Sequence, residues 1–178
     1  PATANVIGGS SANGVAAGVR GATIAGGGLP LGDSDPDYLS EGPNRVTDNF
    51  GVVGGGWGNV AGDSDPALFT GLGATVAGGI VNSATANSST VGGGSGNQAT
   101  ANFATVGGGI NQLASGEGST VAGGSQNIAQ ALQSSIGGGS FQVATGSNAT
   151  IAGGLENTAS GVQSTIGGGR GHDATAFV

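Results

Sequence analysis

The sequence predicts an all-β protein: a parallel β-solenoid or β-roll of about ten coils of fifteen residues, with two acidic loop inserts. Two observations carry this prediction. A fifteen-residue motif repeats without interruption from Val76, and a fixed short period over consecutive units is typical of stacked repeats. The composition, with 42 glycines in 178 residues and only 7% charged and 4% aromatic residues, does not suit an ordinary globular core. We therefore treat 1–178 as a single repeat domain with regular coils at 76–178.

Each unit places the same residue types at the same positions, as VGGGSGNQATANFAT (91–105) illustrates. Place one, the opener, is a branched aliphatic residue, and glycines follow it. Place seven is an amide, place nine an alanine, place eleven alanine or glycine, and place fifteen threonine or serine. We expect the openers to form the core: Val76, Val91, Val106, Val121, Ile136, Ile151 and Ile166. We expect the amides to stack in a ladder, bonding one another or completing turns: Asn82, Asn97, Gln112, Asn127, Gln142 and Asn157.

Two short strands are predicted in each coil. Places fourteen to two and places seven to eleven alternate between apolar and polar residues, which is the pattern of a half-buried strand. The glycines at places three and four and the variable places twelve and thirteen are expected to form the corners. A helix is disfavoured, because each glycine costs about 1 kcal/mol relative to alanine. With one branched aliphatic residue per coil facing inward, the interior must be thin.

Upstream of Val76 the repeat continues with interruptions. Val6, Ile24 and Val53 are expected to open the first three coils, which gives ten coils in all. Inserts of about 29–43 and 62–69 interrupt the second and third coils. Because these coils are adjacent, we expect the inserts to lie close enough to meet.

The two inserts share the motif Gly-Asp-Ser-Asp-Pro and hold six of the ten acidic residues. Alternating aspartates present the hard oxygen ligands that Ca²⁺ prefers, although the spacing is not that of an EF-hand. The same motif is also ordinary turn chemistry. The sequence therefore leaves two readings open, a solvated acidic loop and a calcium site. The candidate ligands are Asp33, Asp35, Asp37, Glu41, Asp63 and Asp65.

The segment ASGVQSTIGG (159–168) resembles the head repeats of trimeric autotransporter adhesins. That resemblance implies a left-handed parallel β-roll, three chains side by side, and adhesion at a bacterial surface. The fifteen-residue unit, the glycine triplet and the amide at place seven depart from the usual repeat of that family. Trimerisation and adhesion are thus implied by the resemblance alone.

Charge and composition argue against several function classes. A net charge of −7, with Arg20, Arg45 and Arg170 as the only basic side chains, disfavours nucleic acid as a partner. No apolar run is long enough for membrane insertion. The repeat lacks the aspartate per turn of a calcium β-roll and the second threonine rank of an ice-binding solenoid. The single histidine, His172, stands at place seven, and no serine has a base nearby in sequence, so we expect no enzyme and no cofactor other than calcium.

These patterns lead us to expect an extracellular or cell-surface structural subunit that self-assembles into a fibre. Ala4–Val6 corresponds to places fourteen to one and His172–Val178 to places seven to thirteen, so stacked chains would continue the period. Such head-to-tail contacts make filaments. Two alternatives remain open: an adhesin head that binds a surface receptor through its inserts or an aromatic face, and a phage tail-fibre segment.

Overall fold

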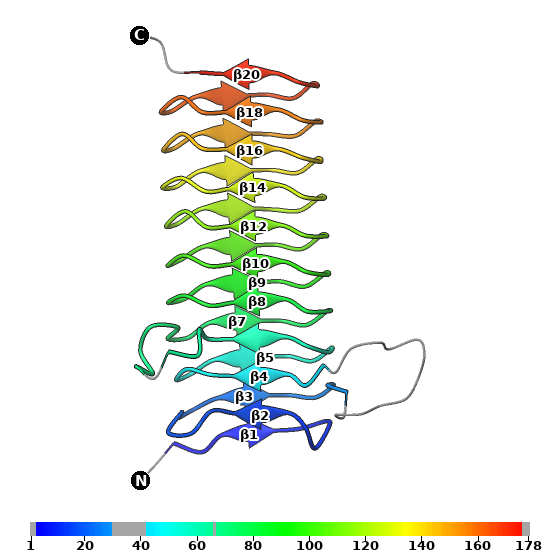
Figure 1. Cartoon of the computed structure of the whole chain (residues 1–178), viewed down its shortest axis with the longest axis vertical. Helices are drawn as coiled ribbons and strands as arrows, with labels where there is room; N and C mark the ends of the chain where they lie inside the picture. The colour runs from blue at the N-terminus through cyan, green and yellow to red at the C-terminus, as the bar shows by residue number, and fades with distance from the viewer. Residues whose placement is uncertain (1–2, 30–41, 66, 176–178) are drawn as a thin grey trace.

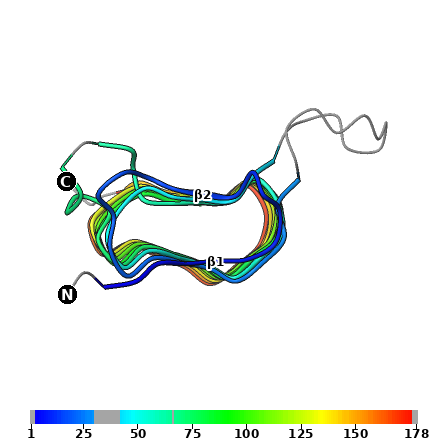
Figure 2. The same cartoon turned by 90° about the horizontal axis from the view of Figure 1, so that it is seen from below.

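The computed structural model describes residues 3–29, 42–65 and 67–175 and confirms an all-β parallel solenoid of about ten turns. Figure 1 shows a column of stacked coils with the N-terminal and C-terminal coils at opposite ends. Seen along the column in Figure 2, the coils superpose as a flattened ring with two long sides. Each long side is a ten-stranded parallel sheet, and the described residues contain no helix.

Odd-numbered strands form one sheet, here called sheet A, and even-numbered strands form sheet B. The strands of sheet A are β1 (Val6–Ile7), β3 (Thr23–Ile24), β5 (Val52–Val53), β7 (Thr75–Val76), β9 (Thr90–Val91), β11 (Thr105–Val106), β13 (Thr120–Val121), β15 (Ser135–Ile136), β17 (Thr150–Ile151) and β19 (Thr165–Ile166). Those of sheet B are β2 (Gly14–Val15), β4 (Arg45–Val46), β6 (Val60–Ala61), β8 (Ser83–Ala84), β10 (Gln98–Ala99), β12 (Leu113–Ala114), β14 (Ile128–Ala129), β16 (Val143–Ala144), β18 (Thr158–Ala159) and β20 (Asp173–Ala174).

Consecutive regular coils are in register at a spacing of fifteen residues. β11 pairs with β13, so that Val106 lies beside Val121. The strands are two residues long, shorter than the alternating patterns predicted, because corners begin on both sides of them. Ladder bonds continue one residue further, as where the Gly107 N–H donates to the Val121 carbonyl at 2.9 Å. In the first coil the register differs from the prediction, since Ile7 and not Val6 pairs with Ile24.

The core is a narrow double row of side chains between the two sheets. The seven predicted openers are all buried, and Ile166, the most exposed of them, is only 6% accessible. Opposite them lie the fully buried alanines of place nine, such as Ala99 and Ala114. Burial of each opener contributes about 1.5–3 kcal/mol. Because one face of the core is alanine, the two walls lie close together, as the composition predicted.

Besides the glycine of place four, two places in each regular coil have a left-handed backbone, and each of them turns a corner. In the coil opened by Val91 these are Gly96 at place six (φ 69°) and Phe103 at place thirteen (φ 60°). Their N–H groups donate to the preceding coil, to Ile80 and Asn87 respectively, both at 2.9 Å. The glycine of place four is needed for another reason. A Cβ on Gly94 would collide with the Gly109 carbonyl oxygen of the next coil.

Candidate functional site

The amides of place seven lie inside the corner and satisfy backbone groups of two coils. Asn97 is fully buried. Its Nδ2 donates to the Gly93 carbonyl of its own coil at 2.7 Å and to the Gly109 carbonyl of the next coil at 2.9 Å. Its Oδ1 accepts the Gln112 N–H at 2.9 Å. One side chain therefore replaces three hydrogen bonds that the turn cannot make for itself.

The link from side chain to backbone joins successive coils without a break. Nine side chains accept the N–H of the next place-seven residue at 2.8–3.1 Å, and the last of these residues is His172: Asn13, Asn44, Asn59, Asn82, Asn97, Gln112, Asn127, Gln142 and Asn157. The amide ladder thus links coils mainly by hydrogen bonds between a side chain and the backbone, unlike the side-chain ladders of cross-β stacks. Asn59 also donates directly to the Asn44 side chain, at 3.2 Å.

The two glutamines of the ladder fit it less well than the asparagines. Gln112 and Gln142 are buried, and each Oε1 accepts the N–H of the next coil as an asparagine would. Their Nε2 atoms, however, have no hydrogen-bond partner. The extra methylene changes the position of the amide, so the donors are buried without acceptors. An unsatisfied buried donor costs about 1–3 kcal/mol.

The second insert leaves the solenoid at an acidic corner. The ladder of backbone hydrogen bonds between coils continues through Gly62, whose N–H donates to the Ala84 carbonyl at 2.8 Å. The regular turn resumes at Gly71, whose carbonyl accepts the Ala74 N–H at 3.2 Å. The segment outside the ladder is therefore 63–70. Asp63 Oδ1 accepts the Asp65 N–H at 2.8 Å, and Asp65 Oδ1 accepts the Ala67 N–H at 2.9 Å. One carboxylate oxygen of each aspartate thus accepts a backbone hydrogen bond within the insert.

Asp48 is a buried member of this corner that the sequence analysis missed. Its Oδ2 accepts the Asp63 N–H at 3.0 Å, and its Oδ1 has no hydrogen-bond partner. Burial raises the pKa of Asp48, the nearby Asp63 carboxylate raises it further, and backbone hydrogen bonds from Asp63 and Gly71 oppose the shift. A signal was present in the sequence, because the register puts an acid at place eleven, where regular coils have alanine or glycine.

Only part of the predicted calcium set can be placed. Asp33, Asp35, Asp37 and Glu41 lie outside the described residues, whereas Asp63 and Asp65 are exposed on the second insert. Within the described ranges no three acidic or histidine side chains gather as metal ligands would.

The two inserts begin on different edges of the solenoid. The first is bounded by Leu29 and Gly42, between β3 of sheet A and β4 of sheet B, and the second lies between β6 of sheet B and β7 of sheet A. Figure 2 shows these two corners at opposite ends of the flattened ring. The expectation that the inserts lie side by side therefore does not hold for their bases.

The end coils present unpaired strand edges of opposite hydrogen-bonding character. At the C-terminal edge the N–H groups that point along the column, on Thr165, Gly167, Arg170, Asp173 and Thr175, have no acceptor among the described residues. At the N-terminal edge the carbonyls of Asn5, Ile7, Gly9, Asn13 and Val15 have no donor in the same part of the chain. The C-terminal edge thus offers mainly donors and the N-terminal edge mainly acceptors, although in regular coils the N–H groups of places six and thirteen point the other way.

No protein-family model matches the chain, and no curated protein matches its sequence. Across the described ranges we find no helix with the length and apolar character needed to span a bilayer.

Proposed function

We propose that this chain is a non-enzymatic structural subunit that stacks end to end into a polar fibre. The observation that carries the proposal is the direction of the hydrogen bonds between coils. In a regular interface five backbone N–H groups donate toward the C-terminal end. Between the coils opened by Val91 and Val106 these are Thr90, Gly92, Ser95, Gln98 and Thr100, whereas the N–H groups of places six and thirteen donate the other way. The same five places supply the donors of the last coil, and the carbonyls that would receive them are open on the first coil.

Docking one copy on another in this register would continue the solenoid. Thr165 would donate to Asn5 of the next copy, and Gly167 to Ile7, with the remaining three pairs in the same order. Open strand edges are the usual templates for strand addition, and no described element covers these two. Contact between two like ends would set most donors against donors or most acceptors against acceptors. Growth is therefore expected in one orientation, as a heterologous contact that does not close into a ring.

In this proposal the fibre lies outside the cell or on its surface. Support comes from the resemblance of the repeat to adhesin head repeats. The partner in the proposal is a second copy of the same chain.

A proline at the donor edge tests the proposal. The Gly167 N–H makes no bond within the described residues, so Gly167→Pro removes one assembly donor and adds a ring at the edge while the inner coils keep their ladder. The matched control is Ile128→Gln, which changes the outer face of sheet B. Sedimentation of the parent chain should show oligomers that lengthen with concentration. Gly167→Pro should stay monomeric with an unchanged circular dichroism spectrum, and Ile128→Gln should assemble as the parent does.

The control also separates two modes of assembly. Loss of assembly in Ile128→Gln but not in Gly167→Pro would show that the sheets associate laterally, which contradicts end-to-end stacking. A parent chain that remains monomeric at every concentration contradicts it as well.

A further inference from the structure

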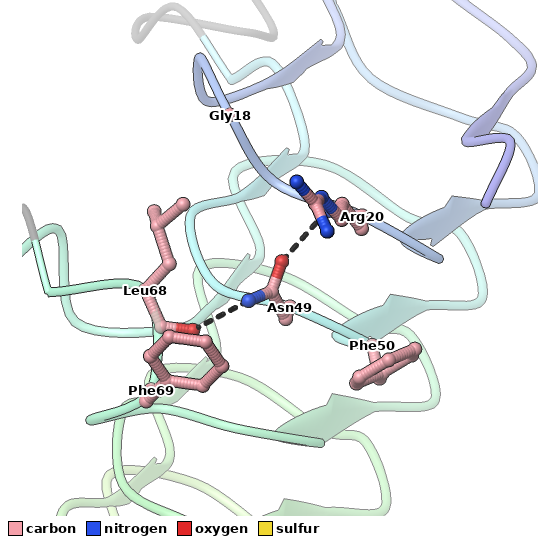
Figure 3. Close-up of a pocket in the computed structure, with 6 residues that line it drawn as sticks. All are labelled: Gly18, Arg20, Asn49, Phe50, Leu68 and Phe69. Carbon is pink, nitrogen blue, oxygen red and sulfur yellow. Dashed lines mark hydrogen bonds between the residues drawn. The ribbon is translucent and has the colours of Figure 1, made fainter. Parts of the chain in front are cut away.

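A small pocket lies at the corner where the second insert folds back on the first two coils (Figure 3). Its volume is about 300 Å³, at the small end of the range for ligand pockets. It is lined by Gly18, Arg20, Asn49, Phe50, Leu68 and Phe69. It adjoins the acidic corner, since Asn49 follows Asp48 and Leu68 and Phe69 belong to the second insert.

Asn49 holds the pocket together from within. The side chain is buried, with 5% of its surface exposed. Its Oδ1 accepts the Arg20 N–H at 2.7 Å, and its Nδ2 donates to the Leu68 carbonyl at 3.0 Å. One amide therefore ties the insert to the coil below it, as the two dashed bonds in Figure 3 show. Since both polar ends of Asn49 are engaged, it acts as scaffold and leaves the ligand contacts to its neighbours.

The walls of the pocket are apolar and open to solvent. Phe50 is 52% exposed and Phe69 is 69% exposed, so both rings have apolar surface that a ligand can cover. Phe50 stands at place thirteen and has the left-handed backbone of that corner (φ 59°). Its ring lies against the backbone of Gly21, where any side chain would collide with it. The ring is thus held at the surface beside the pocket.

Arg20 supplies the one charge of the pocket lining. Its side chain is exposed, and the ion pair found within the described residues is formed by a different arginine, Arg170, with Glu156. Figure 3 shows the guanidinium on one side of Asn49 and the Leu68 and Phe69 side chains on the other. A guanidinium without a carboxylate partner is suited to a planar anion, which it binds with two parallel hydrogen bonds.

We propose that this pocket binds a small aromatic carboxylic acid, with the ring against Phe50, Leu68 and Phe69 and the carboxylate on Arg20. Sugars fit less well, because the lining has no free amide or carboxylate to satisfy several hydroxyl groups. Multiply charged anions are disfavoured by the net charge of −7 and by a single cation at the site. A pocket of this size takes one ring with a short acidic chain.

The test uses 3-phenylpropionate as the probe and follows the ¹H–¹⁵N spectrum of the full chain. Saturable shifts are expected at Arg20, Phe50 and Phe69, with a Kd on the order of 1 mM for so small a ligand. Arg20→Gln should weaken binding at least about tenfold, since a charge-assisted pair is lost. The Arg20 backbone N–H still bonds Asn49, so the melting temperature should not change. Arg170→Gln, at the far end of the column, is the matched control and should bind as the parent does.

Two further ligands separate the contributions of ring and charge. 3-Phenylpropanamide, which keeps the ring and loses the charge, should bind at least tenfold more weakly than the acid, and acetate should give no saturable shift. Equal binding of the acid by Arg20→Gln and the parent would overturn the proposal. So would equal binding of the acid and the amide, or the absence of saturable shifts at these residues well above the expected Kd.

Discussion

Replacing a ladder glutamine by asparagine should stabilise the protein, although it removes a buried methylene. In Gln112→Asn the shorter amide can take the position of Asn97 and donate to two carbonyls of its own and the next coil, as Asn97 does. Two new hydrogen bonds contribute about 1 kcal/mol each, and an unsatisfied buried donor is removed. The lost methylene costs about 0.8 kcal/mol. The net gain is about 1–2 kcal/mol, or a rise in melting temperature of about 2–8 °C for a chain of this size.

The reverse exchange and a truncation provide matched comparisons. Asn97→Gln should destabilise the protein by a similar amount, because it creates a buried Nε2 donor without an acceptor, as in Gln112. Asn97→Ala should cost about 3–5 kcal/mol, since the Gly93 carbonyl and the Gln112 N–H lose their partner and the Gly109 carbonyl keeps only the Ser95 N–H. Gln112→Ala removes one such partner, the acceptor of the Asn127 N–H, and should cost less.

Urea unfolding of dilute protein, followed by circular dichroism, measures these differences. The midpoint should rise in Gln112→Asn and fall in the other three variants, with Asn97→Ala lowest. A Gln112→Asn variant less stable than the parent would refute the ladder reasoning. Equal losses in Asn97→Ala and Gln112→Ala would refute it as well, because the number of partners would then not matter.

Three further predictions concern the core and the acidic corner. Val106→Asp places an unpaired charge in the core and should cost several kcal/mol, whereas outward-facing Thr105→Asp should cost far less; equal melting temperatures would contradict the inside–outside assignment. Asp48→Asn should stabilise the protein at pH 7, because burial and Asp63 disfavour the ionised acid. An aspartate whose pKa is raised in the folded state lowers the stability of the protein at pH values above its ordinary pKa. The stability gained in Asp48→Asn should therefore fade below the ordinary aspartate pKa of 3.8. A gain that persists in acid would refute this cause. If the acidic inserts bind Ca²⁺, millimolar calcium should raise the melting temperature and EDTA should lower it, less so in Asp63→Asn; no shift leaves them as acidic turns.

The period of the repeat made much of the fold predictable. A spacing of fifteen with one aliphatic residue per unit determines which side chains face inward, and Val76 and its six successors are all buried. The positions of the amides and glycines also follow from the period. Strand length was less predictable, because corners at places six and thirteen leave two residues for each strand.

The position of the second insert could not be predicted from the sequence. The backbone of Asp63 and Leu68 bonds to the side chains of Asp48 and Asn49, which are fifteen or more positions away. The repeat contains no information on that path, since no other coil has such a segment. The same holds for the pocket, whose lining residues come from two successive coils and the insert. The poor fit of Gln112 could not be predicted for another reason. Glutamine and asparagine both carry an amide, so a sequence pattern treats them as equivalent.

X-ray diffraction from oriented fibres of the purified chain tests end-to-end stacking most directly. Strands perpendicular to the fibre axis should give a strong reflection near 4.8 Å along that axis. Ten coils per chain should add an axial repeat of roughly 48 Å, because each copy continues the column of the one before it. Fibres in which the 4.8 Å spacing runs across the axis, or in which the repeat of about ten coils is absent, would contradict a column built from chains joined at their ends.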